Sequence, residues 1–515
     1  MKRVRSTCVA AVALACGLAA SPALAQFDNS VWPGFRGAAP KRGAVSAAGP
    51  SLTLGFRVEV PDFGTTTPGG FTVASNGDIY FKAYSPTNSR VYRLNPATGA
   101  VLASSADFAG NGGNYGGVAI GTDALYVCIY NGAGNTKIVK LNKTTLATIT
   151  EFTNAAFLGL RGTPLIGSVP NTNGNVNLYI HDRNGAKLHC VDSVTGNLQW
   201  SYSLIYDTPF GQAGPQWLTQ DGKQAIGYFG NGNFGPGAAI KDNGDSTFTV
   251  LWDATGPGNF NWWGSGALST DGTKIYVTTF NDPVPPGTTL TDAMWAIKVS
   301  DGSIAWSGGG GEANHFGRPA VIDTTVYAGS AAGRVYCYED QGTTGAIRWI
   351  YQNNDPGEFT AVSAVKTPAG VKYIYAVQQD TASATQNGRY VVLRDDGATV
   401  TELLDTTLNG ALRWSLFSNC AATLDSTGAV WVAGGRVDDP TPGSIYKFVA
   451  AGAVCYPNCD NSTTPPILNV NDFICFQSKF AAGDTYANCD NSTAPPILNV
   501  NDFICFQTKF AAGCR

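Results

Sequence analysis

The chain has 515 residues, enough for several domains or for one large repeat fold with a substantial core. Only 14% of the residues are charged, 62 are glycine and two are methionine, a composition that favours short strands joined by tight turns over long surface helices. We therefore predict an all-β protein, and its formal net charge of −4 makes it a poor candidate for binding the phosphate backbone of DNA or RNA, so we expect no nucleic-acid partner.

Residues 1–25 have the features of an export signal. "MKRVR" is basic, "STCVAAVALACGLAA" is apolar and "SPALA" ends in a small-x-small pattern, so we predict cleavage after Ala25. A lipoprotein signal ending at Cys16 is the alternative, but Ala13 stands where a large aliphatic residue is usual. Cleavage removes three basic residues, which leaves 30 − 37 = −7. We expect a periplasmic, cell-surface or secreted protein without a membrane span.

A loose repeat fills residues 51–450, after a lead-in at 26–50. Each unit has a strand, a polar turn and a second strand that often ends in Trp, as in "LHCVDSVTGNLQWSY" from Leu188 and "WAIKVSDGSIAWS" from Trp295. Asn95 and Asp395 hold the same place six units apart, so 300 residues give about fifty per unit, the size of a four-stranded propeller blade.

The two ends of this region complement each other. The last unit, "IYKFVAAG" from Ile445, lacks an outer strand, whereas the strand-like "SLTLGFRVEV" from Ser51 stands unpaired before the first unit. Pairing the strand from Ser51 with the last unit would close the ring and cover two exposed sheet edges. We therefore predict an eight-bladed β-propeller, with seven blades as the alternative.

Lines such as "DSVTGNLQW" and "VSDGSIAW" resemble the tryptophan-docking repeats of the pyrroloquinoline-quinone (PQQ) propeller superfamily, and "VWPGFRG" from Val31 is similar to the segment before its first blade. A Trp that ends an outer strand can pack flat on the next blade while its N–H finds a carbonyl there. We expect this structural role for four tryptophans: Trp200, Trp252, Trp306 and Trp349.

The superfamily contains quinone-dependent dehydrogenases and proteins that only bind partners, so the fold does not decide the function. The sequence has no Cys-Cys pair of the kind that covers PQQ in the alcohol dehydrogenases, no CxxCH haem motif and no HExxH or HxH spacing. After the signal there are three histidines, His181, His189 and His315. We predict a non-catalytic binding protein without PQQ. A quinone-dependent oxidoreductase or carbohydrate-processing enzyme is the alternative.

Aromatic and basic residues recur where the innermost strands should begin, around one mouth of the propeller. Such residues suit a sugar or peptide ligand. The alternative is that the tryptophans plug the central channel. The candidate ligand site comprises Arg161, Trp262, Trp263, His315, Arg318, Arg413 and Trp414.

The last 65 residues, 451–515, form a different unit. "NCDNSTTPPILNVNDFICFQSKFAAG" from Asn458 returns from Asn488 with two substitutions, giving repeats at 458–483 and 488–513. Phe473, Phe476 and Phe480 would form one face of a helix, and the oxygen-bearing side chains before that helix suit Ca²⁺. The scattered Cys128, Cys190, Cys337 and Cys420 are expected to be small buried residues of the propeller.

This duplicated unit resembles a dockerin of the cysteine-bearing type that ends in "AAGC", which docks into cohesin partners. The resemblance implies a cohesin-like protein or a cell-surface component as partner, contacted by Val470, Asn471, Val500 and Asn501. It implies as Ca²⁺ ligands Asn458, Asp460, Ser462, Asn469, Asp472, Asn488, Asp490, Ser492, Asn499 and Asp502.

The unit also departs from the dockerin pattern. The first ligand is Asn rather than Asp, and "TTPPI" lengthens the loop, so we expect weak Ca²⁺ binding. A loop held by its disulfide without metal, and a unit that merely caps the propeller, are the alternatives.

Six cysteines of the unit allow fifteen pairings. The repeat symmetry favours Cys459 with Cys475 and Cys489 with Cys505, which leaves Cys455 and Cys514 to join the two ends.

Overall fold

A computed structural model gives the fold. It describes residues 44–46, 49–59, 67–84, 88–109, 117–130, 136–182, 184–185, 187–203, 216–218, 226–228, 237–254, 266–279, 292–309, 315–354, 357–379, 388–408, 422–425, 427–434, 444–450, 457–460, 462, 468–490, 492 and 495–512. The predicted signal peptide lies outside these ranges. Within them, no helix is long and apolar enough to cross a membrane.

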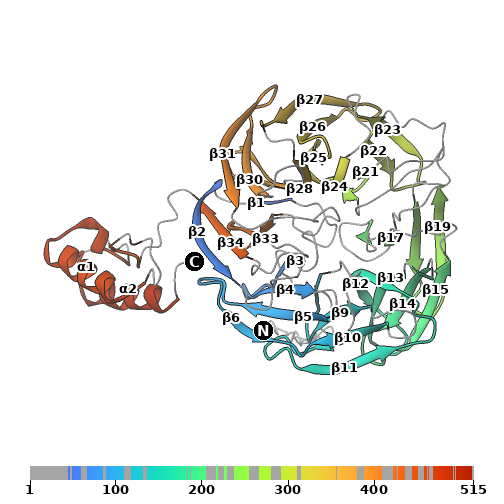
Figure 1. The fold of residues 1–515 in the computed structure, drawn as a ribbon, viewed down its shortest axis with the longest axis horizontal. Coiled ribbons are helices and arrows are strands. Elements are labelled where there is room, and N and C mark those ends of the chain that lie inside the picture. The colour runs from blue at the N-terminus through green and yellow to red at the C-terminus, as the bar shows by residue number, and fades with distance from the viewer. Residues whose placement is uncertain are drawn as a thin grey trace, which may run out of the picture.

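Eight sheets of four main strands surround a common axis (Figure 1), which confirms the eight-bladed β-propeller and rules out seven blades. Blade 1 contains β3 (Thr67–Val73), β4 (Ile79–Tyr84), β5 (Asn88–Leu94) and β6 (Val101–Ser104), with the short β7 (Phe108–Ala109) paired to β5. Blade 2 contains β8 (Ala119–Ile120), β9 (Leu125–Ile129), β10 (Lys137–Leu141) and β11 (Thr148–Thr153). Blade 3 contains β12 (Leu160–Pro170), β13 (Val176–Asp182), β14 (Lys187–Asp192) and β15 (Leu198–Ser203).

The middle blades follow the same order. Blade 4 contains β16 (Gln216–Trp217), β17 (Ile226–Tyr228), β18 (Gly237–Asp242) and β19 (Phe248–Ala254). Blade 5 contains β20 (Ala267–Leu268), β21 (Lys274–Thr278), β22 (Met294–Lys298) and β23 (Ile304–Gly308). Blade 6 contains β24 (His315–Ile322), β25 (Thr325–Ser330), β26 (Arg334–Asp340) and β27 (Gly345–Gln352).

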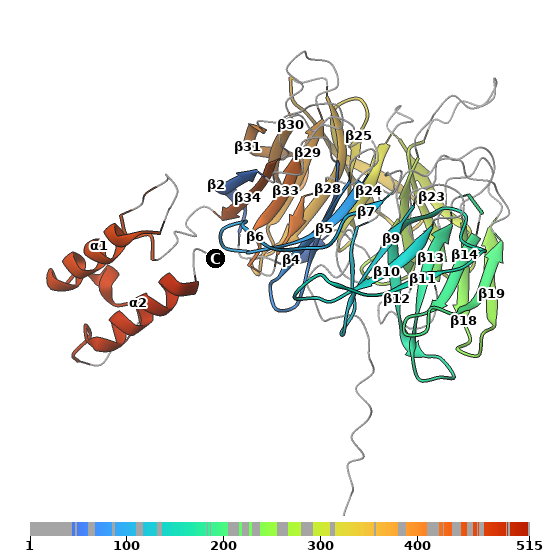
Figure 2. The same ribbon diagram turned by 60° about the horizontal axis from the view of Figure 1, so that its bottom comes forward.

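The last two blades each take a strand from the N-terminal region. Blade 7 contains β28 (Glu358–Lys366), β29 (Lys372–Gln379), β30 (Gly388–Asp395) and β31 (Val400–Leu408), and β1 (Ala44–Ser46) runs parallel to β28 at its inner edge. Blade 8 contains β32 (Thr423–Leu424), β33 (Val430–Gly434), β34 (Ser444–Ala450) and, as its outer strand, β2 (Ser51–Glu59). The C-terminal α1 (Val470–Ala481), η3 (Thr485–Ala487) and α2 (Val500–Ala512) lie outside the ring in both views (Figures 1 and 2).

The antiparallel order of the strands gives the propeller two different ends. The connections from first to second strand and from third to fourth strand lie at one end, which we call the turn end. The connections from second to third strand, and those between blades, lie at the other end, which we call the loop mouth. The connections between blades include residues 204–215, 255–266 and 409–422, whereas turns such as 74–78 and 95–100 serve the turn end. The loop mouth therefore carries the longer chain segments, where binding residues are usually found.

The predicted ring closure is confirmed. β2 pairs antiparallel with β34 from Ser51↔Ala450 to Glu59↔Ser444. The Ser51 hydroxyl donates to the Gly428 carbonyl at 2.8 Å, and the Tyr390 hydroxyl donates to the Ser51 carbonyl at 3.1 Å. The N-terminal strand thus bonds to blade 8 and to the neighbouring blade 7.

The four predicted tryptophans are buried and bridge neighbouring blades. The prediction of a carbonyl acceptor holds for Trp252, which donates to the Val299 carbonyl at 2.7 Å. It is wrong for the other three tryptophans, because the third strand of the next blade ends in an aspartate beside the indole. Their indole N–H groups donate to these carboxylates at 3.0–3.1 Å: Trp200 to Asp242, Trp306 to Asp340 and Trp349 to Asp395.

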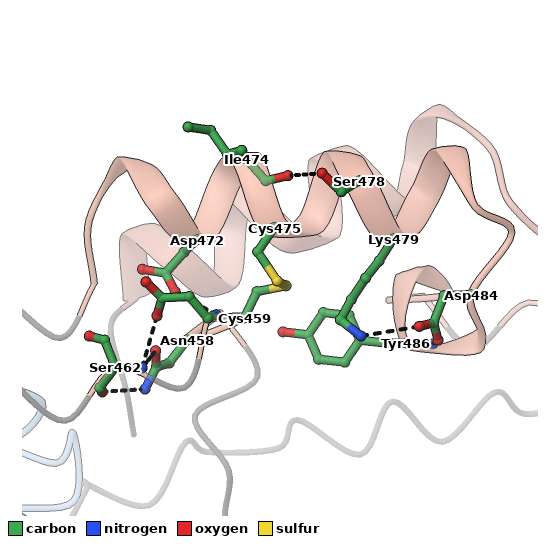
Figure 3. Close-up of a disulfide and its surroundings, with 11 residues drawn as sticks. Asn458, Cys459, Ser462, Asp472, Ile474, Cys475, Ser478, Lys479, Asp484 and Tyr486 are labelled. Carbon is green, nitrogen blue, oxygen red and sulfur yellow. Dashed lines mark hydrogen bonds and ion pairs between the residues drawn. A yellow bond between two sulfur atoms is a disulfide. The ribbon is translucent and has the colours of Figure 1, made fainter.

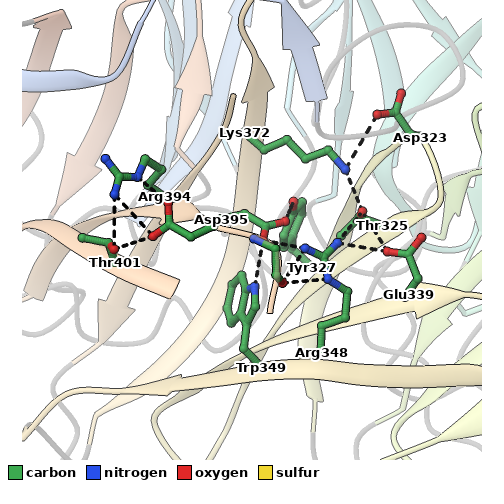
Figure 4. A network of polar contacts seen from close by, with 12 residues as sticks. Asp323, Thr325, Tyr327, Glu339, Arg348, Trp349, Lys372, Arg394, Asp395 and Thr401 are labelled. Carbon is green, nitrogen blue, oxygen red and sulfur yellow. Dashed lines mark hydrogen bonds and ion pairs between the residues drawn. The ribbon is translucent and has the colours of Figure 1, made fainter. Parts of the chain in front are cut away.

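Asp395 illustrates how this aspartate organises the turn end (Figure 4). Its carboxylate accepts hydrogen bonds from the indole of Trp349, from the hydroxyl of Tyr327 at 2.7 Å and from the backbone N–H of Gly397 at 2.9 Å. Arg348 adds an ion pair at 2.9 Å. A carboxylate with this many donors fixes the turn of its own blade to the second and fourth strands of the blade before it.

The scattered cysteines behave as predicted where they can be seen. Cys128, Cys190 and Cys337 form no disulfide and are buried in strands, and burial raises the pKa of the Cys128 thiol to about 12. Protonated, buried thiols act as small apolar residues. Cys420 lies outside the described residues.

Candidate functional site in the C-terminal module

Residues 457–512, the C-terminal module, have a hydrophobic core of their own. Its members all lie between Cys459 and Phe510. Six phenylalanines dominate it, three from equivalent positions of each helix: Phe473, Phe476 and Phe480 of α1, and Phe503, Phe506 and Phe510 of α2. This confirms the apolar helix face predicted from their spacing.

The phenylalanine contacts reveal a two-fold relation between the repeats. The middle rings of the two helices, Phe476 and Phe506, stack at a centroid distance of 4.1 Å. The first ring of α1 meets the last of α2 at 4.4 Å, and the last of α1 meets the first of α2 at 4.6 Å. The helices therefore pack antiparallel, and exchanging the repeats leaves the contact pattern unchanged.

Both predicted loop-to-helix disulfides are present. Cys459 bonds to Cys475 and Cys489 bonds to Cys505, with Cα–Cα distances of 5.6 and 5.8 Å (Figure 3). Each staples the loop before a helix to the middle of that helix, which is useful in a unit with so small a core. The third predicted pair, Cys455 with Cys514, lies outside the described residues.

The first loop gathers most of its predicted ligands at the start of α1. Asp472 accepts the backbone N–H of Asn469 on Oδ2 at 2.8 Å and that of Asp460 on Oδ1 at 3.3 Å. The Asn458 side-chain oxygen accepts the backbone N–H of Ser462 at 3.0 Å. Asn469 caps the helix, because its side-chain oxygen accepts the N–H of Asn471 at 2.8 Å. This geometry organises the loop around the Asp472 carboxylate.

The second loop repeats the arrangement thirty residues later. Asp502 accepts from the backbone of Asn499 at 2.8 Å and from that of Asp490 at 3.3 Å. Asn488 accepts from the N–H of Ser492 at 3.0 Å. The donor set is thus built twice with the same distances.

The chemistry of this donor set fits a hard cation only in part. Burial raises the pKa of Asp472, and the neighbouring Asp460 carboxylate raises it further, so these two acids crowd one another as ligands of a shared cation would. However, no group of three or more His, Cys, Asp or Glu side chains gathers anywhere in the described part of the chain. Each loop therefore offers two carboxylates, with amide and hydroxyl oxygens to complete the coordination.

The predicted partner-contacting residues are exposed. Val470 is 69% exposed and Val500 68%, and Asn471 and Asn501 are also exposed. Sequence reasoning missed Ile474 and Ile504, each 55% exposed one turn further along its helix. Figure 3 shows Ile474 on the side of α1 turned away from the disulfide. Their signal was the i, i+4 spacing from each valine, which places both aliphatic side chains on one helix face.

These two aliphatic pairs face the same side of the module. Successive residues advance by about 100° around a helix, so Val470 and Ile474 lie roughly a quarter turn from the phenylalanine face. The two-fold axis that relates antiparallel helices runs perpendicular to the plane containing them, and a direction along that axis is unchanged by the rotation. The pair Val500 and Ile504 therefore points to the side that Val470 and Ile474 occupy. Together they form one surface, which we call the symmetric apolar face.

The candidate ligand site of the propeller is only partly visible. The innermost strands of blades 3 and 6 contain Arg161, as the second residue of β12, and His315 and Arg318, which belong to β24. The remaining members lie outside the described residues: Trp262, Trp263, Arg413 and Trp414. His181 and His189 are fully buried in blade 3, and His189 contacts the Asp182 carboxylate at 3.3 Å and the Ser201 hydroxyl at 2.8 Å.

No family model and no curated protein matches the chain. Among solved structures, it is similar to the computationally designed Ika8 protein (TM-score 0.47, 11% identity, 79% of this chain and 99% of that one) and to the C-terminal WD40 domain of Sif2 (0.48, 10%, 79% and 100%). It is also similar to a europium-containing methanol dehydrogenase (0.40, 12%, 82% and 98%) and to the quinohemoprotein alcohol dehydrogenase of Comamonas testosteroni (0.38, 12%, 81% and 80%). At such values the likeness concerns the propeller fold alone. The chain is an eight-bladed β-propeller followed by a small helical module.

Proposed function

We propose that this protein is an exported, non-catalytic binding propeller that is displayed on an extracellular assembly through its C-terminal module. The observation that carries the proposal is the symmetric apolar face. Four large aliphatic side chains, each more than half exposed, stand at equivalent positions of two helices whose core and disulfides already stabilise the unit. Exposed apolar groups gathered in this way mark a protein interface more often than they mark open surface.

The proposed partner is a cohesin-like protein or another cell-surface component. Because the two repeats present matching residues on one side, a partner can engage the module in either of two orientations related by the two-fold axis. We propose that each orientation relies mainly on one of the two valines, so loss of that valine removes one orientation and leaves the other available.

This gives a test with a distinctive pattern. The full chain carrying either Val470→Asp or Val500→Asp should lose only about a factor of two in partner affinity, the weight of one of two equal orientations. The double variant should lose at least about tenfold, because each orientation then buries a charge. The measurement is retention of cell-envelope protein on immobilised full-length chain. Leu102→Asp, at an exposed propeller position, is the control. If each single variant lost as much partner affinity as the double variant, the two-orientation proposal would be contradicted.

We also propose that each loop binds Ca²⁺ through its two aspartates, with the amide oxygen of the leading Asn as a further ligand. The loop disulfides hold the donors together before metal arrives, and the bound cation would relieve the crowding of Asp460 and Asp472. With two carboxylates per loop, the dissociation constant should lie on the order of 10⁻⁴ to 10⁻³ M, as in extracellular modules.

Isothermal titration of the full chain with CaCl₂ should therefore show two weak sites. Asp460→Asn should abolish one site, and the added Asp490→Asn should abolish the other, because each change removes one of two carboxylates from a loop. Titration with MgCl₂ gives the selectivity. Unchanged Ca²⁺ heats in the double variant would show that the loops rely on their disulfides alone.

For the propeller itself we propose ligand binding at the loop mouth, to a carbohydrate or a peptide. The longer connections start and finish at strand ends on this side, and the innermost strands of blades 3 and 6 carry Arg161, His315 and Arg318 near this end. The absence from the sequence of the adjacent cysteine pair of quinone-dependent alcohol dehydrogenases favours binding over quinone chemistry.

A further inference from the structure

Glu358 has a buried carboxylate oxygen without a partner at the loop mouth. It is the first residue of β28, the innermost of the four main strands of blade 7. Its Oε2 is buried and has no hydrogen-bond partner among the described residues. Burial alone raises the pKa of this carboxyl group to about 7, since no neighbouring cation or donor offsets the loss of water. An unpaired buried acid is unfavourable in a native fold and needs an explanation.

The polar groups around it are already engaged with one another. Gln378, fully buried on the paired strand β29, donates to the Gly357 carbonyl at 2.8 Å and to the Asn353 side-chain oxygen at 3.1 Å. Arg389 of β30 is the cation of this end of the blade, and it binds Asp405 at 2.7 Å. Among its described residues, the blade thus supplies an ion pair for Asp405 and none for Glu358, although both acids lie toward the same end.

The opposite end of the ring shows that this fold readily saturates its acids. At the turn end, Asp395 receives four donors, and Asp340 receives Trp306, Lys274 and a backbone N–H. At the loop mouth, the hydroxyl of Thr136, just before β10, is a second buried polar group without a hydrogen-bond partner in the described part of the chain. Incomplete satisfaction of buried polar groups at the loop mouth, in a fold that saturates the acids of its turn end, is typical of a binding site.

We propose that the loop mouth binds a ligand bearing an organic cation, an ammonium or guanidinium group, and that Glu358 receives this group. The inference rests on the proposed binding role of the mouth and adds the chemical class of its ligand. A cation is favoured because it would supply charge-assisted hydrogen bonds to a carboxylate that burial has deprived of water.

The test uses the full chain and n-butylammonium chloride as the probe, with potassium chloride at the same ionic strength as reference. The probe should raise the Tm of the wild type, and by more at pH 8 than at pH 5, because Glu358 is ionised only at the higher pH. Glu358→Gln, which keeps the shape but removes the charge, should show no rise at either pH. Glu402→Gln is the matched control, since the Glu402 carboxylate already accepts the Tyr351 hydroxyl at 2.6 Å, and it should respond like the wild type.

An equal rise in Glu358→Gln, or no rise in the wild type, would overturn the inference. Butyrate and n-butanol separate this outcome from failure of the proposed function. If either of them raises the Tm while butylammonium does not, the mouth binds ligands but not through a cation.

The pH dependence of stability gives a second measurement. The pKa of Glu358 is about 7 in the folded state and near 4.3 when unfolded, so between these values the folded chain holds an extra proton and loses stability as pH rises. The variant Glu358→Gln should lack this loss, and its stability relative to the wild type should increase from about pH 4.5 to 7 and then level off. Both proteins share the other ionisable groups that blades 6 and 7 carry toward the loop mouth, so their effect on stability cancels in the difference between the two proteins. These groups are His315, Arg334, Arg389 and Asp405. A constant difference would mean that Glu358 is paired in solution.

Discussion

Removal of residues 27–62 should prevent the propeller from surviving as a stable monomer. The deletion takes away β2, and with it the antiparallel ladder to β34 that runs from Ser51 to Glu59. It leaves the edge of β34 open and removes the Ser51 carbonyl that the Tyr390 hydroxyl contacts. An open edge of this length pairs with other chains, so we expect aggregation or a large fall in Tm, measured by size-exclusion chromatography and thermal unfolding.

A shorter deletion provides the control. Removing residues 27–48 takes away only β1, whose pairing with β28 covers three residues, and leaves the whole of β2 in place. This variant should stay monomeric. If the longer deletion melts like the parent, the eighth blade does not depend on the N-terminal strand.

Trp306→Ala should lower the free energy of unfolding by about 3–5 kcal/mol, the usual effect of truncating a large buried aromatic side chain. Trp306 is 4% exposed, and its ring lies so close to Gly345 of the next blade that a Cβ there would approach it to 2.4 Å. The variant also deprives Asp340 of an indole donor. Urea unfolding measures the loss, and Trp306→Phe, which keeps an aromatic ring but not the N–H, should lose less. A variant that keeps its stability but loses ligand binding would instead identify Trp306 as part of a site.

The number of blades could be predicted because two independent patterns agreed. A unit of about fifty residues set the size of a blade, and the unpaired strand at Ser51 matched the strand missing after Ile445. The acceptors of the tryptophans were not predicted, because they belong to the next unit along the chain. A signal did exist: Asp242, Asp340 and Asp395 each precede a turn glycine by two residues.

The C-terminal module was predictable in its helices and disulfides because its two copies are nearly identical and constrain one another. The relative orientation of the two aliphatic pairs was not predictable, because it follows from how the phenylalanines pack between helices. Glu358 carries no motif at all. Its distinction is a buried Oε2 without a hydrogen-bond partner among the described residues, which depends on where Arg389 and Gln378 direct their side chains.

Because blade 8 takes its outer strand from the N-terminal region, the propeller ring can close only after β34 has been synthesised. This outer strand is made among the first residues and must wait for β34, nearly four hundred residues later, so the ring closes through contacts of very long sequence separation, which form slowly. The C-terminal module follows β34 directly in the chain. A polypeptide interrupted before the last blade therefore lacks both the closing partner β34 and the C-terminal module. If that module docks as we propose, only a chain that includes the last blade can be recruited, and the order of the sequence would exclude incomplete products.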